Sequence, residues 1–330
     1  MKKYTVAVLM GGQSGENEVS LASGSMVLEA LLSRGHQAYA VEITKQGLWR
    51  RKDQPLPQGM AVLESIAHAL RPQPDVVFIA LHGPKGEDGT VQGLLEIAGI
   101  PYTGSGVLAS ALGMDKHRSR QIFKEHGLVF PPYIFLRQGE SLEERLREAR
   151  ERFGVPLVIK PNNLGSSLMV AISSSLDHLR SGLEEILAQS SEALIEKYLP
   201  GKEITVPLIG NDSPQALPVI EIVPAGLFFD YRAKYNGSTL EICPARIEEK
   251  IAKKAQEIAV CAFQALGCRG FARADMIYFE ESIYLLEINT IPGLTRESLL
   301  PKSAKVAGLE FPDLVEKIIE LGLESWKSDT

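Results

Sequence analysis

A segment near the C-terminus, residues 270–290 (GFARADMIYFEESIYLLEINT), predicts a β-hairpin that carries charged side chains on otherwise apolar strands. Because side chains alternate along a strand, Arg273 and Asp275 share one face of the first strand. Glu287 and Asn289 likewise share one face of the second strand, where we expect Glu287 to lie opposite Asp275. Arg273 then faces Asn289, and the two facing carboxylates repel each other by roughly 3 kcal/mol at an effective dielectric constant of about 20. The pattern therefore predicts a cation between the two acids.

The register of this hairpin depends on its turn. A three-residue turn over residues 280–282 places Phe279 opposite Ile283 and brings the two acids together. Leu285 and Leu286 make the second strand apolar, and charges on a buried strand need partners. Carboxylate and amide oxygens suit Mg²⁺ or Mn²⁺ holding a polyphosphate better than they suit zinc. The alternative is a solvent-facing strand that carries the acids by chance.

The composition is that of an ordinary soluble protein, with 330 residues, 45% hydrophobic and 23% charged. This length predicts two or three domains. The net charge of −6 gives no basic face for nucleic acid, and no apolar run is long enough for a membrane span. The apolar part of MKKYTVAVLMGG is too short for a signal peptide, and three cysteines at no metal-ligand spacing indicate reduced thiols. We therefore expect a cytoplasmic protein.

The first hundred residues or so alternate strands and helices, which predicts a parallel sheet covered by helices. The predicted elements are strands at residues 5–10, 37–43 and 75–81, and helices at residues 18–32, 62–70 and 90–98. Two glycine-rich loops, residues 11–16 (GGQSGE) and 82–89 (HGPKGEDG), follow strands and should meet at one cleft. Neither loop has dinucleotide or P-loop spacing, and simple tight turns are the alternative. Glu16 and His82 in these loops could hold the two ends of an amino acid.

The middle of the chain offers an anion site. Residues 101–113 predict a loop feeding a helix that continues through residues 114–116, with a domain boundary nearby. A strand at residues 155–160 ends in Lys160, and residues 161–167 (PNNLGSS) follow as a flap whose backbone N–H groups and hydroxyls could bind phosphate. A lysine that merely extends from an apolar strand to solvent is the alternative.

Residues 193–209 predict a second hairpin around a Pro-Gly turn. The extended segment 196–199 could offer adenine one N–H and one C=O, with Glu203 accepting from ribose hydroxyls. A long loop at residues 224–244 carries Lys234 and Tyr235, and loops of this length tend to be functional lids.

With these motifs in order, the chain resembles the D-alanine–D-alanine ligase family of the ATP-grasp superfamily. The resemblance covers nearly the whole length, through GGQSGENEVS, HGPKGEDG, YTGSGVLASALGMDK, KPNNLGSS, EKYLPGKEITV, DYRAKY, GFARADMIYF and LLEINTIPGLTRESLLP. It implies an α/β fold, α+β in the ATP-grasp part, with an N-terminal parallel-sheet domain (residues 1–104), a central lid domain (105–195) and a C-terminal catalytic domain (196–330). A homodimer that serves peptidoglycan precursor synthesis is also implied.

The resemblance implies that ATP binds to matching residues of this chain. Lys116 and Lys160 would hold the phosphates, and Lys234 would reach the γ-phosphate. The adenine hinge would be formed by Glu196, Lys197 and Leu199, and Glu203 would accept from the ribose. The implied ligands of two Mg²⁺ ions, or of Mn²⁺, are Asp275, Glu287 and Asn289, in agreement with the hairpin.

The remaining implied roles concern two D-alanine molecules. Glu16 and His82 would orient the first D-alanine, while Ser166 and Tyr235 would couple Glu16 to the closing loop. Arg273 and the Gly293 amide would stabilise the oxyanion. The second D-alanine's carboxylate would be held by Ser298 and Leu299.

The implied chemistry begins when the first D-alanine's carboxylate attacks the γ-phosphate to give an acyl phosphate and ADP. The second D-alanine's amine then attacks and phosphate leaves, so no covalent nucleophile of the protein is needed. Leu164 and Met169 depart from the family pattern in the flap, whereas Lys234-Tyr235 follows the form that uses an amine. The alternatives are a related ligase using D-serine or D-lactate as second substrate, or a binding protein that has lost turnover.

Overall fold

A largely parallel sheet forms the N-terminal part of the protein. The computed structural model describes residues 2–164, 169–223 and 240–329. The N-terminal strands are β1 (Thr5–Gly11), β2 (Gln37–Ile43), β3 (Trp49–Arg50) and β4 (Val76–Ile79). They lie in the order β3-β2-β1-β4, and only the short edge strand β3 is antiparallel. The predicted parallel sheet is therefore correct, and β1 and β4 are apolar runs because they are buried on both faces.

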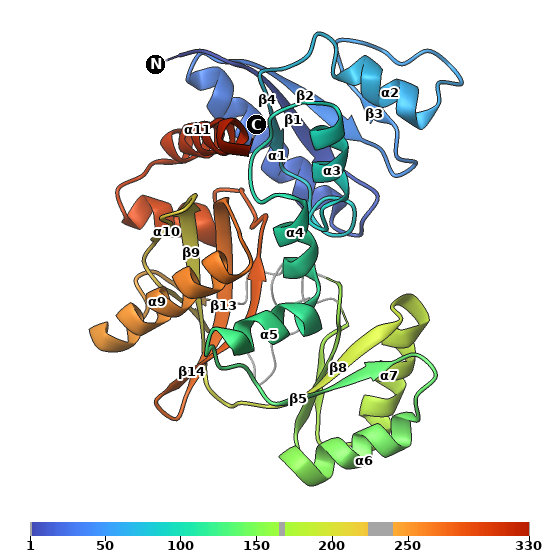
Figure 1. Ribbon diagram of the computed structural model, residues 1–330, viewed down its shortest axis with the longest axis vertical. Coiled ribbons are helices and arrows are strands. Elements are labelled where there is room, and N and C mark those ends of the chain that lie inside the picture. The colour runs from blue at the N-terminus through green and yellow to red at the C-terminus, as the bar shows by residue number, and fades with distance from the viewer. Residues whose placement is uncertain (1, 165–168, 224–239, 330) are drawn as a thin grey trace.

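Three helices accompany this sheet, α1 (Asn17–Ser33), α2 (Val62–Ala69) and α3 (Thr90–Ile97). All three were expected within one or two residues of these bounds. The last helix of the chain, α11 (Phe311–Asp329), also packs here, and its Leu314 and Ile318 belong to the same hydrophobic core as Val8 and Leu31. Figure 1 shows α11 beside α1, and α11 also contacts β13 of the sheet that precedes it in the sequence.

The central part contains a second, antiparallel sheet. Its elements are α4 (Val107–Met114), α5 (Lys116–Glu125), β5 (Tyr133–Arg137), α6 (Leu142–Phe153), β6 (Leu157–Pro161), β7 (Ala171–Ser173), α7 (Leu176–Gln189) and β8 (Glu192–Lys197). The strand order is β5-β8-β6-β7. The expectation that one helix runs through residues 114–116 is wrong: Asp115 is extended and caps a new helix, its side chain accepting from Arg118 N, so Lys116 begins α5.

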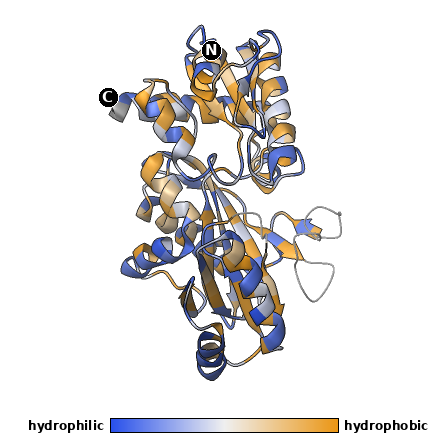
Figure 2. Ribbon diagram, turned by 90° about the vertical axis from the view of Figure 1, so that its right-hand side faces the viewer, coloured by the Kyte–Doolittle hydropathy of each residue, from blue (hydrophilic) through white to orange (hydrophobic). Residues whose placement is uncertain are grey.

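The C-terminal part holds a third sheet, in the order β12-β11-β9-β13-β14 with β10 paired to β9. Its elements are β9 (Lys202–Gly210), β10 (Gln215–Ala216), β11 (Ile220–Val223), β12 (Leu240–Ile242), α9 (Glu249–Ala265), β13 (Gly270–Phe279), β14 (Ser282–Asn289) and α10 (Leu299–Val306). Figure 2 shows hydrophobic and hydrophilic residues alternating along the helices, as amphipathic helices require.

The predicted hairpin at residues 193–209 is wrong. β8 pairs with β5 and β6, whereas β9 pairs with β10, β11 and β13, so the chain crosses from one sheet to another between them. Two apolar strands joined by a Pro-Gly turn look like a hairpin locally, but non-local pairing decided the outcome. None of the helices in the described ranges combines the length and apolar character that a bilayer crossing requires.

Candidate active site

The two acids of the C-terminal hairpin meet as expected. Asp275 on β13 pairs with Glu287 on β14, and Arg273 pairs with Asn289. The turn, however, consists of residues 280–281 alone, both with positive φ, so the predicted three-residue turn is wrong. A β-bulge directly after Asp275 supplies the extra residue on β14 and restores the register that the longer turn would have produced.

Each acid is already held by a cation of the protein. Arg273 Nε and Nη2 donate to the two carboxylate oxygens of Asp275 at 2.8 and 2.7 Å, and the Thr205 hydroxyl donates to Asp275 Oδ1 at 2.6 Å. Lys116 Nζ lies 3.1 Å from Glu287 Oε2. These contacts fix the carboxylates in place and offset their mutual repulsion.

The donor set of the hairpin fits a hard divalent cation that also binds phosphate. Asp275, Glu287 and Asn289 supply oxygen atoms only, and Mg²⁺ is commonly bound through one or two carboxylates with the remaining ligands from phosphates and water. Within the described residues, no group of three or more His, Cys, Asp or Glu side chains is placed to hold a metal by itself. A phosphate-bearing ligand would therefore have to complete the coordination.

A first cavity of about 510 Å³ lies between the central sheet and the C-terminal sheet. Its walls include the predicted nucleotide residues Lys116, Lys160, Glu196, Lys197, Leu199 and Glu203, together with Asp275 and Glu287. Val158 and Ile172 of the central sheet and Ile222 and Ile277 of the other sheet give it apolar walls. A cavity with apolar walls and several charged side chains suits a nucleotide.

A buried ion cluster includes two residues of this cavity's wall, Lys160 and Glu196. Glu196 Oε1 lies 2.9 Å from Lys160 Nζ and 2.7 Å from Arg120 Nη1. Burial alone would raise the pKa of Glu196, but Arg120 and Lys160 outweigh it and hold the pKa below its usual value. Arg120 was not predicted; it is completely buried, and its cationic group lies over the rings of Phe130 and Tyr133.

A second cavity, also of about 510 Å³, adjoins the first. It brings together the predicted substrate residues Glu16, His82, Arg273, Asn289, Gly293, Ser298 and Leu299. Lys116, Glu203, Asp275 and Glu287 line both cavities. The facing acids of the hairpin therefore stand where the two cavities meet.

The two glycine-rich N-terminal loops converge on the second cavity, as expected. Gly83 has a φ of 73°, and a Cβ on it would lie 2.8 Å from a carboxylate oxygen of Glu16. His82 Nε2 lies 3.3 Å from the Ser23 hydroxyl. Burial lowers the pKa of His82 to about 4, with Arg273 acting in the same direction and a hydrogen bond to the Ile291 backbone opposing it.

Glu87 is a further acid of this cavity that was not predicted. Its carboxylate accepts from Gly83 N at 2.7 Å, and its side chain is buried. Burial, with the negative charge of Glu16 next in importance, raises the pKa of Glu87 to about 8. The only sequence signal was its place in the loop HGPKGEDG, where an acid between glycines does not reveal which way it points.

Helix α10 begins at the far wall of the second cavity. Ser298 is its N-cap and Leu299 its first residue. The Ser298 hydroxyl accepts from Thr295 N at 3.1 Å, and a Cβ on Gly293 would meet it at 2.8 Å. The backbone at Gly293 thus runs tight against the start of α10, and a helix N-terminus suits a carboxylate.

Three predicted site residues, Ser166, Lys234 and Tyr235, lie outside the described residues. The two flap residues that depart from the family pattern, Leu164 and Met169, are both described. Leu164 O accepts from Lys116 Nζ at 3.0 Å. Met169 has a φ of 62°, a conformation that favours glycine.

Comparison with known proteins identifies the family. A model described as "D-ala D-ala ligase N-terminus" matches residues 5–105, and one described as "D-ala D-ala ligase C-terminus" matches residues 122–320. The chain belongs to the D-alanine–D-alanine ligase family. The D-alanine–D-alanine ligase of Syntrophobacter fumaroxidans is 46% identical to it over 98% of this chain and 99% of its own.

Solved structures of D-alanine–D-alanine ligases share the fold. The enzyme from Bacillus anthracis complexed with ATP has a TM-score of 0.81 and 36% identity, with 100% of both chains covered. The VanG D-Ala:D-Ser ligase from Enterococcus faecalis has a TM-score of 0.81 and 32% identity, covering 97% of this chain and 100% of that one. The expected ATP-grasp ligase fold is thereby confirmed.

Proposed function

We propose that this protein joins two D-alanine molecules to D-alanyl-D-alanine at the expense of ATP, releasing ADP and phosphate. The observation that carries this proposal is the meeting of two cavities at Asp275 and Glu287. One cavity suits a nucleotide and the other a small zwitterion. Relatives with full-length coverage are named D-alanine–D-alanine ligases, in agreement with this activity.

The nucleotide would occupy the first cavity. The backbone of residues 196–199 would contact adenine, Glu203 the ribose, and Lys116 and Lys160 the phosphates. Asp275, Glu287 and Asn289 would hold two Mg²⁺ ions, or Mn²⁺, which supply charge neutralisation for the triphosphate. Lys234 is proposed to reach the γ-phosphate.

The first D-alanine would lie in the second cavity with its ammonium group near Glu16 and His82 close by. Its carboxylate attacks the γ-phosphorus, forming an acyl phosphate and displacing ADP. The carboxylate oxygen becomes part of a good leaving group, which it was not before. We assign Ser166 and Tyr235 to the coupling of Glu16 with the closing loop.

The second D-alanine would present its carboxylate to Ser298 and to the Leu299 amide at the start of α10. Its amine, after losing a proton, attacks the acyl carbon to give a tetrahedral oxyanion. Arg273 and the Gly293 N–H stabilise this oxyanion. Phosphate then leaves and the peptide bond remains.

D-serine is the second candidate for the incoming nucleophile, because a D-Ala:D-Ser ligase is among the structures that share this fold. Phosphate release should be followed with ATP, Mg²⁺ and D-alanine, and then with D-serine or D-lactate added. We expect turnover with D-alanine alone. No phosphate release with D-alanine, but release with D-alanine plus D-serine, would favour the alternative.

Further proposals concern organisation. We propose domain boundaries near residues 104 and 195, a homodimeric assembly and a cytoplasmic location. Light scattering coupled to size-exclusion chromatography tests the assembly, since a mass near the 36.1 kDa of a single chain would contradict it.

A further inference from the structure

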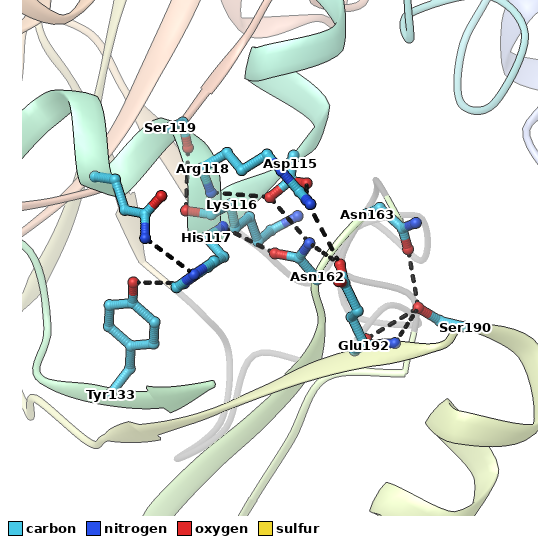
Figure 3. A network of polar contacts seen from close by, with 11 residues as sticks. Asp115, Lys116, His117, Arg118, Ser119, Tyr133, Asn162, Asn163, Ser190 and Glu192 are labelled. Atoms are coloured by element: carbon cyan, nitrogen blue, oxygen red, sulfur yellow. Dashed lines mark hydrogen bonds and ion pairs between the residues drawn. The ribbon is translucent and has the colours of Figure 1, made fainter. Parts of the chain in front are cut away.

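Asn162 is a completely buried amide directly after β6, the strand that carries Lys160. It lines neither cavity, yet each of its polar groups forms a hydrogen bond. Figure 3 shows its side chain between the start of α5 and Glu192. A buried amide without partners would cost stability, and the partners of Asn162 indicate what it holds together.

The side-chain contacts define the orientation of the amide. Asn162 Oδ1 accepts from His117 N at 2.8 Å. Asn162 Nδ2 donates to Asp115 Oδ1 at 3.0 Å and to Glu192 Oε2 at 2.8 Å. A flipped amide would turn its oxygen toward two carboxylates, so only one orientation fits.

The backbone of Asn162 continues the same connection. Its C=O accepts from Lys116 N at 3.2 Å, and its N–H donates to Glu192 O at 3.2 Å. The first three N–H groups of α5 are therefore satisfied by two residues: those of Lys116 and His117 by Asn162, and that of Arg118 by Asp115. Asn162 thus shares the capping of a helix to which it does not belong.

We infer that Asn162 is a positioning residue for nucleotide binding, which holds the helix that begins with Lys116 against the strand that carries Lys160. This inference rests on the proposed function, in which both ammonium groups contact ATP phosphates. Both lysines line the first cavity, but Lys116 lies on α5 and Lys160 on β6. These two elements are not adjacent in the sequence, so non-covalent contacts must hold them together. Asn162 is the described residue whose side chain and backbone both join them.

Charge makes the amide specific. Asp115 and Glu192 approach the same nitrogen, so an aspartate at 162 would bring a third carboxylate to the point where a donor is required. The Asn162→Asp variant preserves shape and the acceptor for His117 N while it removes both donated hydrogen bonds. Burial acts to raise the pKa of Asp115. Hydrogen bonds from Arg118 and Asn162 outweigh this effect and hold the pKa below its usual value.

Asn211, directly after β9, supplies a matched control. Its Oδ1 accepts from Gly270 N at 3.0 Å and its Nδ2 donates to Glu324 Oε2 at 3.1 Å, so it also joins a backbone N–H to a carboxylate, but it lines neither cavity. The experiment measures the Kd of ATP by titration in the presence of Mg²⁺, and separately the KM of D-alanine. Both are measured well below the thermal unfolding midpoint of each variant.

We expect N162D to raise the Kd of ATP by about tenfold or more, because small misplacements of binding groups are costly. N211D should change it by less than about twofold, because Asn211 lines neither cavity, and the KM of D-alanine should stay near the original value in both. Equal ATP affinity in N162D and N211D would overturn the inference, as would equal losses for ATP and D-alanine.

A second variant guards against a simple folding defect. In N162D/E192Q the donor and acceptor change places, because the amide introduced at position 192 can donate to the carboxylate introduced at position 162. We expect this exchange to recover most of the ATP affinity lost in N162D, and no recovery in a well-folded double variant would contradict the inference. ATP that fails to bind the unmodified protein would instead refute the proposed function.

Discussion

Lys116 Nζ lies 3.1 Å from Glu287 Oε2, so the first residue of α5 holds a carboxylate that lines both cavities. The ammonium group would have to serve a carboxylate and a phosphate at once. Divalent cations beside Glu287 would weaken the attraction between its carboxylate and the Lys116 ammonium group when a nucleotide is bound. The pair therefore links the proposed metal site to the proposed phosphate site.

Replacing Glu287 by Gln tests the metal assignment. The amide keeps the shape and loses the charge, so phosphate release with ATP and D-alanine should fall by at least about a hundredfold. Glu281, exposed in the turn of the same hairpin, gives the control variant E281Q, which should retain activity. Full activity of E287Q would remove Glu287 from the metal site.

Gly83→Ala should impair the handling of the first D-alanine. The added Cβ would lie 2.8 Å from Glu16 Oε2, and the φ of 73° disfavours any other residue. Gly99→Ala is the control, because Gly99 has a φ of 66° with nothing within 4 Å of the added atom. Both variants should lose about 1 kcal/mol of stability from the backbone.

Only G83A should also raise the KM of the first D-alanine, because only there does the new methyl group displace Glu16. Steady-state kinetics at saturating ATP measures this. Similar KM values for G83A and G99A would show that Gly83 does not position Glu16.

His82 predicts a pH dependence of stability. Its pKa in the folded protein is about 4, below the ordinary value of 6.5, because burial disfavours the charged ring. As the pH falls below the ordinary value, the unfolded chain takes up a proton that the folded protein refuses. This group should therefore cost roughly 2 kcal/mol of stability between about pH 7.5 and about pH 5.

Urea unfolding of H82N at the two pH values should show a correspondingly smaller loss. His178, exposed on α7, gives the control H178N, which should behave like the unmodified protein. If H82N loses as much stability on acidification as H178N, the neutral buried state of His82 is wrong.

Glu196→Gln should destabilise the protein by about 3 kcal/mol, because it leaves Arg120 and Lys160 buried without their shared counter-charge. The Glu196 side chain is only 4% exposed. In contrast, Glu184 pairs with Arg180 on the surface and is 56% exposed, so E184Q should change stability by less than about 1 kcal/mol. Urea unfolding compares the two, and equal effects would show that the buried cluster contributes no more than a surface pair.

Local signals were enough to predict much of the site. Strand alternation within one hairpin was enough to predict that Asp275 lies opposite Glu287. The two-residue turn and the bulge that together produce this register were not predicted. The N-terminal loops were placed at one cleft because parallel strands end at a common edge. An Asp before a helical segment also marks an N-cap, so the break at Asp115 could have been found.

Non-local contacts could not be predicted in the same way. Whether β8 pairs with β9 or with β5 and β6 depends on the competition between all available strands. Arg120 looks like one more charged residue on a helix, and its burial is explained only by Glu196, which β8 places beside it. The role of Asn162 likewise cannot be predicted from the sequence, because it depends on hydrogen bonds to α5 and to Glu192.

The packing of α11 on the N-terminal sheet has a consequence for synthesis of the protein. Gly322 passes so close to the backbone of Tyr102 that an added Cβ would lie 2.7 Å from its carbonyl oxygen. The N-terminal sheet, whose last strand ends at Ile79, is therefore covered in part by a helix that begins only at Phe311. During translation an apolar surface of this sheet stays exposed to solvent until α11 leaves the ribosome, and a message truncated before α11 would yield a chain prone to aggregation.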